Sequence, residues 1–537
     1  MARSYRPVDR DQAFLLPPDM REWLPDDHLV WLVLDIVAGL DCSALHARHP
    51  NLGPGRSAYD PEMLLALLIY AYCQGVRSSR QIQQRCLTDV AFRVVCAQDA
   101  PDHTTIARFR ADHQEVFAGL FTQVLQVAAA MGLARLGTVA IDGTKIAANA
   151  SIDANRHRDW LVREVAALLD TAAQVDADED AAHDRDGDNH TDRGDGQRVP
   201  ARLRDRSGRA ARLRTALAEV IAREHAAQQA QQDRQTGAAA RLERAQAGES
   251  VIGRIPRGPH RLAEAQAHLK RAVARQQATL DRRAAVIAAG RRPMGRPAVA
   301  VEQHPHVVRA QRAVDAALAA QHSPRGATQL PNPASSRKPH RRGEAVANLS
   351  DPCSRLMPTR RGYLQGFNAQ VAVSSDQLIV ALQLDHSTND QAAFVPMMHA
   401  AQRIADRLHQ LTGRPEHVIG TVLADAGYAS DANLAAPGPD RLIALGKGRD
   451  QAKSPRAGAE PAPAVDATPR ERMRHRLATE DGARLYKRRG ATVEPGIGNL
   501  KKILDRFSRR GLVAATSELH LAATAFNLRK IHRAAHC

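Results

Sequence analysis

The sequence predicts a mixed α/β fold in which a mixed β-sheet is covered by helices and interrupted by a long helical insertion. Short apolar segments typical of strands occur at residues 137–144, 367–373, 378–384, 418–424 and 441–445. A helical pattern fills residues 25–133, and a composition rich in Ala, Arg and Gln separates the first strand from the others. A chain of 537 residues is too long for one ordinary core, so two or three structural units are expected.

The N-terminal region, residues 1–133, is expected to be helical and to serve in assembly or binding. Two short helical patterns, at residues 78–86 and 104–113, open with the good N-cap residues Ser78 and Thr104. The second pattern carries Arg108 and Arg110. Together they resemble a helix-turn-helix, and a small helical bundle that contacts no bases is the alternative.

Residues 151–344 are predicted to form the helical insertion. Val273, Leu280 and Ile287 recur every seven residues, which favours long helices packed as a hairpin. Residues 176–195 read as a flexible acidic loop, and residues 323–342 as a basic linker. The strand segments on either side then belong to one split domain, residues 134–150 and 345–537, with a hairpin turn at 374–376 and a helix over 390–411.

The charge balance favours a polyanionic partner. Lys and Arg total 75 against 58 Asp and Glu, a formal net charge of +17, and aromatic residues are only 4% of the chain. Duplex DNA therefore fits better than a single strand, whose binders use stacked aromatic rings. The six cysteines form no CxxC pair, which disfavours disulfide and zinc frameworks. The longest apolar run, residues 63–73, is too short for a membrane span, so a soluble, cytoplasmic protein is expected.

Three carboxylates stand where catalytic residues often occur. Asp142 and Asp425 each follow an apolar strand, and Glu494 precedes Pro495, which suits the first turn of a helix. Phosphoryl transfer with two metal ions needs such a set converging on the cations. Glu494 and Lys501 are seven residues apart and share one helical face, which would place a phosphate-binding charge beside a metal ligand.

The blocks around these carboxylates resemble bacterial insertion-sequence transposases of the DDE type. The block that starts at Asp142 resembles the family's first catalytic block, residues 424–430 the second, and residues 362–370 the hairpin between them. Tyr486, Arg489, Glu494 and Lys501 resemble the Tyr-x2-Arg-x3-Glu-x6-Lys signature of a large transposase group. The chain departs from it by one residue, because four residues rather than three separate Arg489 from Glu494.

The resemblance implies a ribonuclease-H-like catalytic domain that binds Mg²⁺ or Mn²⁺ through Asp142, Asp425 and Glu494. It implies metal-dependent DNA cleavage at the ends of an insertion sequence and strand transfer into target DNA. The partners would be double-stranded DNA at the element ends and the target, held by a homodimer or higher oligomer. The residues expected to contact DNA are Tyr486, Arg489, Lys501, Lys502 and Arg506.

Two other functions stay open from the sequence. One is a metal-dependent nuclease that cuts DNA without joining it to a second duplex. The other is an inactive DNA-binding relic or repressor, which is disfavoured because all three acidic positions are present.

Overall fold

The computed structural model describes residues 19–47, 58–167, 170, 201–249, 251, 255, 258–292, 299–322, 345–359, 362–446 and 467–536. The predicted acidic loop at 176–195 and linker at 323–342 lie outside these residues. The chain divides into two compact units. The first combines the residues up to Leu217 with those from Val346 onwards, and the second is Ala218–Ala345. The domain boundaries proposed from the sequence at 134, 151 and 345 stay predictions.

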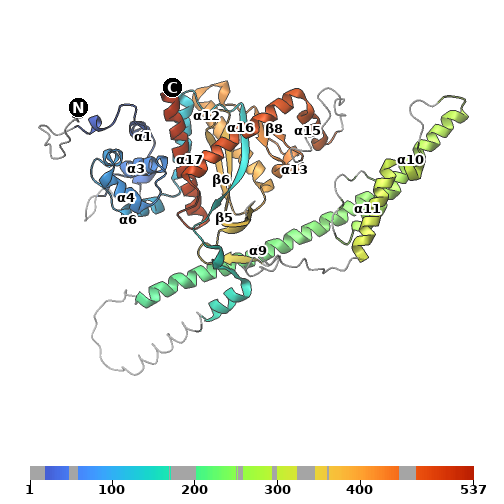
Figure 1. The fold of residues 1–537 in the computed structure, drawn as a ribbon, viewed down its shortest axis with the longest axis horizontal. Helices are drawn as coiled ribbons and strands as arrows, with labels where there is room; N and C mark the ends of the chain where they lie inside the picture. The colour runs from blue at the N-terminus through green and yellow to red at the C-terminus, as the bar shows by residue number, and fades with distance from the viewer. Residues whose placement is uncertain are drawn as a thin grey trace, which may run out of the picture. The chain divides into compact units, whose positions relative to one another are not determined.

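A six-stranded mixed sheet forms the centre of the first unit (Figure 1). Its strands are β1 (Thr138–Ala147), β4 (Arg355–Thr359), β5 (Gly362–Ser374), β6 (Ile379–Asp385), β7 (Thr421–Ala424) and β8 (Asp440–Ile443). The order is β4-β5-β1-β7-β8, and β6 also pairs with β5. Strand β5 is antiparallel to β1, β4 and β6, whereas β7 is parallel to both β1 and β8. The predicted mixed sheet and its interruption after the first strand are therefore confirmed.

The two ends of the interruption are tied together beside the sheet. Strands β2 (Asn155–His157) and β3 (Val346–Asn348) pair as a separate antiparallel ribbon. The buried Asn348 side chain donates to the carbonyl of Ser151 at 2.7 Å and also lies 3.4 Å from the Asn155 side chain. The long excursion of the chain thus starts and ends at one place.

The N-terminal region of the first unit is helical, as predicted. Its helices are α1 (Leu29–Ala38), α2 (Ser43–His46), α3 (Pro61–Cys73), α4 (Ser79–Thr88), α5 (Val90–Val95), α6 (His103–Asp112) and α7 (Phe117–Ala130). Helix α3 is buried along nearly its whole length, and the Asp60 carboxylate caps its N-terminus. No helix among the described residues is both long and apolar enough to cross a membrane.

The helix-turn-helix expectation needs correction. Helices α4 and α6 pack together, but α5 lies between them in the chain, so the connection is longer than the short turn of that motif. Asp102, not Thr104, caps α6, because its carboxylate accepts the backbone N–H groups of Thr104 and Thr105. Arg110 is buried rather than presented to a partner, and only Arg108 is exposed. The region fits the alternative of a small helical bundle.

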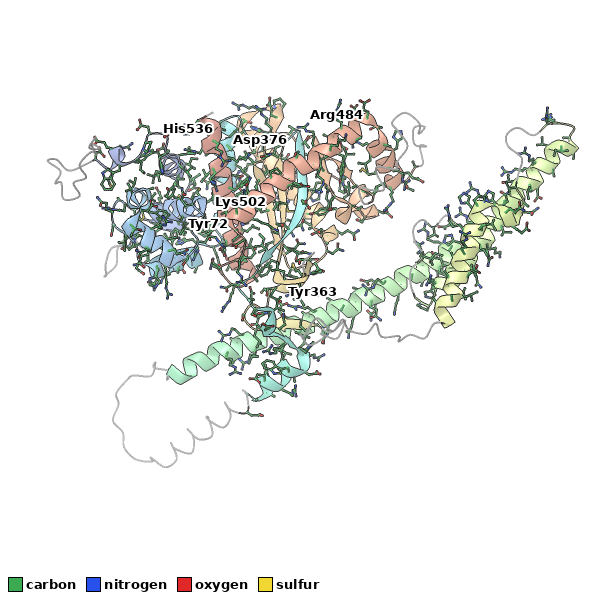
Figure 2. All side chains as sticks on the ribbon, in the orientation of Figure 1. Tyr72, Tyr363, Asp376, Arg484, Lys502 and His536 are labelled. Atoms are coloured by element: carbon green, nitrogen blue, oxygen red, sulfur yellow. The ribbon has the colours of Figure 1, made fainter. Side chains whose placement is uncertain are left out.

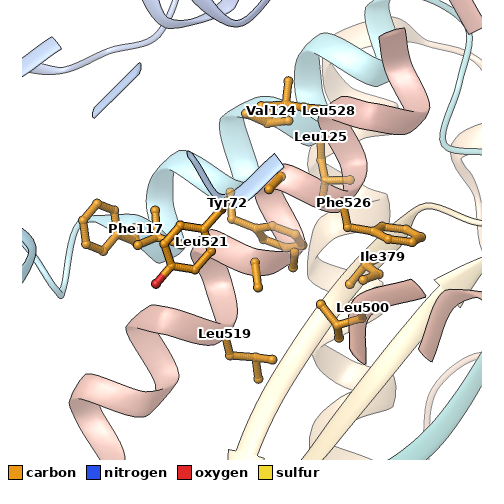
Figure 3. Close-up of a cluster of buried hydrophobic side chains, with 14 of the residues drawn as sticks. Tyr72, Phe117, Val124, Leu125, Ile379, Leu500, Leu519, Leu521, Phe526 and Leu528 are labelled. Atoms are coloured by element: carbon orange, nitrogen blue, oxygen red, sulfur yellow. The ribbon is translucent and has the colours of Figure 1, made fainter. Parts of the chain in front are cut away.

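Helix α17 (Leu512–Ala535) joins the N-terminal helices to the sheet. It packs against α3 and α7 on one side and β6 on the other, in one continuous apolar core (Figure 3). Its buried Asn527 side chain accepts the N–H of Ile379 at 2.9 Å and donates to the carbonyl of Ile379 at 2.8 Å. These bonds satisfy backbone groups of β6 that have no strand partner on that side.

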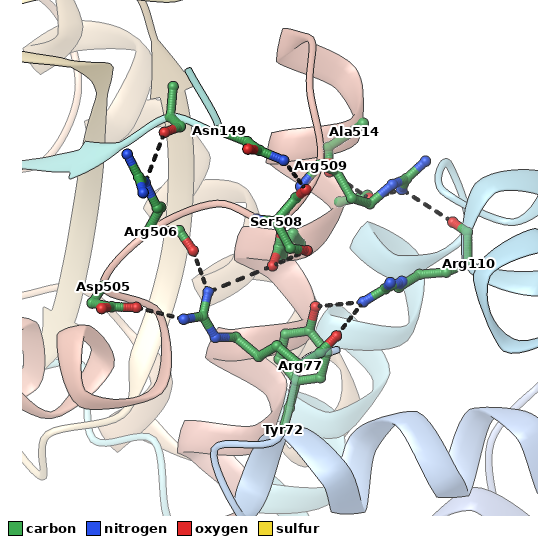
Figure 4. Close-up of polar contacts among 12 residues, drawn as sticks. Tyr72, Arg77, Arg110, Asn149, Asp505, Arg506, Ser508, Arg509 and Ala514 are labelled. Carbon is green, nitrogen blue, oxygen red and sulfur yellow. Dashed lines mark hydrogen bonds and ion pairs between the residues drawn. The ribbon is translucent and has the colours of Figure 1, made fainter. Parts of the chain in front are cut away.

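A polar network ties the same elements at the end of α16 (Glu480–Ile503) (Figure 4). Arg77 donates to the Asp505 carboxylate and to the carbonyl of Arg506. Buried Glu518 accepts the N–H and hydroxyl of Ser508 at 2.9 and 2.8 Å. Arg509 donates to the carbonyl of Arg110 at 3.1 Å. The segment after α16 is therefore held between the sheet and the N-terminal helices.

Other helices of the first unit include α12 (Phe394–Thr412), α13 (Asp431–Ala435) and α15 (Pro469–Ala478). In the second unit, α10 (Arg261–Ala288) packs against α11 (Pro305–His322) through Ala265, Val314 and Ala317, and α9 (Ala201–Gln246) contributes to both units. Val273 and Ile287 of the predicted heptad pattern are exposed. The seven-residue pattern therefore does not mark the face of α10 that packs on α11, which carries the buried Ala265 instead.

Replacing Asn527 by Leu is expected to lower the free energy of unfolding by about 2 kcal/mol or more, because two buried backbone groups of Ile379 lose their partners. Urea denaturation of the full chain measures it. The matched control is Asn499→Leu, since the only partner of the Asn499 side chain among the described residues is Lys502. A control that costs as much as Asn527→Leu would contradict this role for Asn527.

Candidate active site

Asp142 and Asp425 are placed side by side by the register of two parallel strands. Ile141 of β1 is paired with Ala424 of β7, and each aspartate is the next residue in its strand's direction. Strand β7 ends at Ala424, while β1 continues to Ala147 against β5. The prediction that β1 ends at Asp142 is therefore corrected: the strand opens only on its β7 side, where Asp425 turns away.

Each aspartate is oriented by a backbone N–H. Asp142 Oδ1 accepts from the N–H of Gly143 at 2.9 Å, and Asp425 Oδ1 accepts from the N–H of Gly427 at 2.8 Å. Asp425 thereby caps the single turn Ala426–Tyr428 that follows β7. Both carboxylates keep a second oxygen for another partner.

Arg489 on α16 is the counter-ion of Asp142. Its Nη1 donates to Asp142 Oδ2 at 3.1 Å, and the two side chains are only 16% and 23% exposed. Burial raises the pKa of Asp142, the Arg489 guanidinium opposes this shift, and the charge of Asp425 adds to it. Because the charge of Asp425 raises the pKa of Asp142, the two carboxylates are electrostatic neighbours.

Tyr486 lies one helical turn before Arg489 and close to its guanidinium. Burial raises the pKa of the Tyr486 hydroxyl, which the positive charge of Arg489 partly offsets. The two residues that resemble the start of the transposase signature are thus neighbours at the aspartate pair. Their expected contacts with DNA stay predictions.

Glu494 lies on the same helix but faces solvent. Its Oε1 stands over Gly490, where an added β-carbon would be 3.2 Å away, and the residue is exposed. Among the described residues, no group of three or more Asp, Glu, His or Cys side chains converges closely enough to hold a metal ion. Glu494 thus lies on the helix that supplies Arg489 to Asp142, and its role as a metal ligand stays a prediction.

Pro495 is inside α16, not in its first turn as the sequence suggested. A proline there removes the hydrogen bond to the carbonyl four residues earlier, that of Ala491. Gln377, at the tip of the β5–β6 hairpin, supplies a replacement: its Nε2 donates to the Ala491 carbonyl at 3.3 Å. At the next position, Gly496 lets α16 approach the sheet, since an added β-carbon would lie 3.1 Å from the Val373 side chain.

Of the three basic residues predicted at the end of α16, two are free to meet a partner. Lys501 is exposed and has no hydrogen bond or ion pair within the described part of the chain, and exposed Lys502 contacts only Asn499 at 3.2 Å (Figure 2). Arg506 instead donates to the carbonyl of Ala148 at 3.1 Å, at the end of β1. The Arg506 guanidinium is therefore bound to the main chain beside β1.

Asp390 is a site residue that the sequence analysis missed. Its Oδ1 accepts from Asn368 Nδ2 at 2.7 Å and from Gln370 Nε2 at 2.8 Å. Gly143 leaves the room for it, because an added β-carbon there would lie 2.6 Å from Asp390 Oδ1. A usable signal existed: Asn368 and Gln370 are polar side chains at alternate positions of a buried, largely apolar strand segment.

The carboxylates suit a hard divalent cation in chemical type. Asp142, Asp425 and Asp390 bring three negative charges to one end of the sheet against the single guanidinium of Arg489. Oxygen donors with excess negative charge are the ligands that Mg²⁺ and Mn²⁺ prefer. Gly143 and Gly427, with no side chains, let the carboxylates pack closely against the main chain: an added β-carbon would lie 2.6 Å from Asp390 Oδ1 at Gly143 and 3.0 Å from Asp425 Oδ1 at Gly427.

Comparison with known proteins found two similarities. Residues 18–112 match a family model described as Transposase domain (DUF772), and residues 459–532 match one described as Transposase DDE domain. Neither the curated proteins nor the solved structures contain a match. The second segment includes Arg489, Glu494 and Lys501, whereas Asp142 and Asp425 lie outside both. The chain is therefore similar to transposases in two separate segments, the N-terminal helices and the C-terminal helices that border the aspartate pair.

Proposed function

We propose that the chain is a DDE transposase that cleaves DNA at the ends of an insertion sequence and joins the freed 3′ ends to target DNA. The observation that carries this proposal is the side-by-side placement of Asp142 and Asp425, with α16 of the DDE-matching segment supplying Arg489 to them. The α/β scaffold is proposed to be ribonuclease-H-like. This proposal is more specific than the similarity to a transposase DDE domain that the comparisons found.

Asp142, Asp425 and Glu494 would hold Mg²⁺ or Mn²⁺. When bound, such ions activate water or a 3′-hydroxyl for attack and stabilise the leaving oxygen of an in-line displacement. Glu494 is exposed on α16 and must turn toward the aspartates, because the three do not converge in the free chain. Its flexible side chain and the bare backbone at Gly490 leave room for that rotation.

Arg489 prepares the aspartate pair for this role. In the free chain it neutralises Asp142 and so lowers the cost of keeping two adjacent carboxylates ionised. A DNA phosphate competes for the same guanidinium, since planar arginine pairs with phosphate as well as with carboxylate. Tyr486, next to Arg489, would contact the same phosphate.

Lys501 and Lys502 are proposed to bind the phosphate backbone of double-stranded DNA beyond Glu494. Both lie exposed on the last turn of α16. Arg506 continues the same basic run and is anchored to the end of β1 through Ala148. Cleavage at two element ends with joining to one target further implies a homodimer or higher oligomer on DNA.

The variants Asp142→Asn, Asp425→Asn and Glu494→Gln are each expected to reduce cleavage and joining by more than about 100-fold while DNA is still bound, since each loses a metal ligand. The substrate is labelled duplex from the DNA that flanks the coding sequence, with Mg²⁺ or Mn²⁺. Gel analysis follows cut and joined products, and filter binding follows the complex.

Asp406→Asn is the matched control, because Asp406 is an exposed carboxylate on α12 whose only hydrogen-bond partner among the described residues is Gln402. Full activity in the three site variants would refute the proposed ligand set. Cleavage without joined product would support a nuclease instead, and tight metal-independent binding without any cleavage would support a DNA-binding relic.

Removing Lys501 and Lys502 together, as Lys501→Ala with Lys502→Ala, is expected to weaken duplex binding and to lower the slope of log affinity against log salt by about 2, one for each lost phosphate contact. Fluorescence anisotropy over a salt series measures this slope. Arg407→Ala, which removes an exposed cation on α12, is expected to leave it unchanged. An equal slope for native and double variant would exclude these lysines from the DNA interface.

A further inference from the structure

Asp390 lies across strand β1 from Asp142. Side chains of successive strand residues point to opposite faces, so Asp142 faces Arg489 on α16 while Gly143 faces Gln370 and Asp390. Only the backbone of Gly143 separates the two sides at this point. Asp390 Oδ1 would be 2.6 Å from a β-carbon at Gly143, so the carboxylate is packed directly against β1 beside Asp142.

The same carboxylate sets the direction of the Gln370 amide. A carboxylate only accepts hydrogen bonds, so Gln370 turns its Nε2 toward Asp390, at 2.8 Å, and its Oε1 away. That oxygen accepts the hydroxyl of fully buried Tyr428. The result is a buried chain of hydrogen bonds from Asp390 through Gln370 to Tyr428.

Tyr428 belongs to the turn that Asp425 opens. Asp425 caps the turn Ala426–Tyr428, and the Tyr428 ring packs on Phe394 with ring centroids 5.9 Å apart. The residue after Asp390 adds a second tie, because Gln391 Nε2 donates to the carbonyl of Ala429 at 2.9 Å. The position of Asp425 is thus coupled to the segment 390–391.

The three aspartates all act electrostatically on the Tyr428 hydroxyl. Burial is the main cause that raises the pKa of Tyr428, followed by the charges of Asp390, Asp142 and Asp425. Asp390 Oδ2 has no hydrogen-bond partner among the described residues, so only Oδ1 of this carboxylate is stabilised by donors. The carboxylate therefore adds negative potential to the place where a cation would bind.

We infer that Asp390 is a positioning residue of the aspartate pair, which fixes Asp142 through the Gly143 backbone and Asp425 through Gln370 and Tyr428, and raises the affinity of the pair for a divalent cation. The inference rests on the proposed function, because it takes Asp142 and Asp425 as metal ligands. Partners that orient metal ligands from outside typically contribute 10- to 100-fold in metal affinity.

The test is calorimetric titration of Mn²⁺ into the full chain without DNA, together with the rise in Tm that a fixed Mn²⁺ concentration produces. Asp390→Asn keeps an oxygen for Asn368 and Gln370 but removes the charge, and is expected to weaken Mn²⁺ binding about tenfold or more. Tyr428→Phe keeps the ring and removes the bond to Gln370, and is expected to weaken it severalfold. Asp406→Asn, which removes a charge far from the chain of bonds, is expected to match the native protein.

The outcomes separate the inference from the function on which it rests. A lower Tm in both variants with unchanged Mn²⁺ affinity would make Asp390 purely structural and overturn the inference, provided that Asp142→Asn abolishes binding. If Asp142→Asn binds Mn²⁺ like the native protein, the proposed metal site itself fails, and the inference with it. Where a variant is less stable, its Mn²⁺-induced rise in Tm still reports affinity, since ligand stabilisation depends on concentration relative to Kd.

Discussion

The pairing of β1 with β7 is the constraint on which the site depends. Two strands separated by more than 270 residues in the sequence lie parallel with Ile141 opposite Ala424, so Asp142 and Asp425 leave the paired region at the same level. A slip of one residue would send one aspartate to the other face of the sheet. The antiparallel pairing of β1 with β5 opposes such a slip, because nine consecutive residues of β1 are matched to β5.

The second constraint is the docking of helix α16 on the sheet. The contacts there must compensate for the hydrogen bond that Pro495 removes from the helix. Pro495 leaves the Ala491 carbonyl without its helical partner, and Gln377 of the β5–β6 hairpin replaces the lost donor. Gln377 is itself held by Lys530 of α17 at 2.8 Å. Helix, hairpin and α17 therefore share one set of polar contacts, and Gly496 brings the helix close enough for Arg489 to reach Asp142.

The sequence was informative where a local pattern carries the structure. Short apolar segments predicted five of the six strands of the central sheet, all except β4, and the residues before Asp425 correctly predicted its place at a strand end. Contacts set by distant parts of the chain were not accessible: β1 continues past Asp142 because β5 pairs there, and α16 runs through Pro495 because Gln377 compensates it. The sequence does not identify Asp390 as a site residue, because Asp390 reaches the site through its contact with Gly143, which is distant in the sequence.

The segment after α16 shows why a basic run is ambiguous in sequence alone. Lys501 and Lys502 face solvent, but Arg506 and Arg509 donate to the backbone carbonyls of Ala148 and Arg110, in part-buried contacts within the fold. These arginines join the end of β1 to the N-terminal helices, and buried Glu518 accepts from Ser508 between them and lies 3.8 Å from Arg77. A change in the N-terminal bundle therefore reaches the strand that carries Asp142 through hydrogen bonds rather than through a flexible linker. Because the two regions share one apolar core as well, the segment that matches DUF772 is a structural part of the unit that carries the aspartate pair.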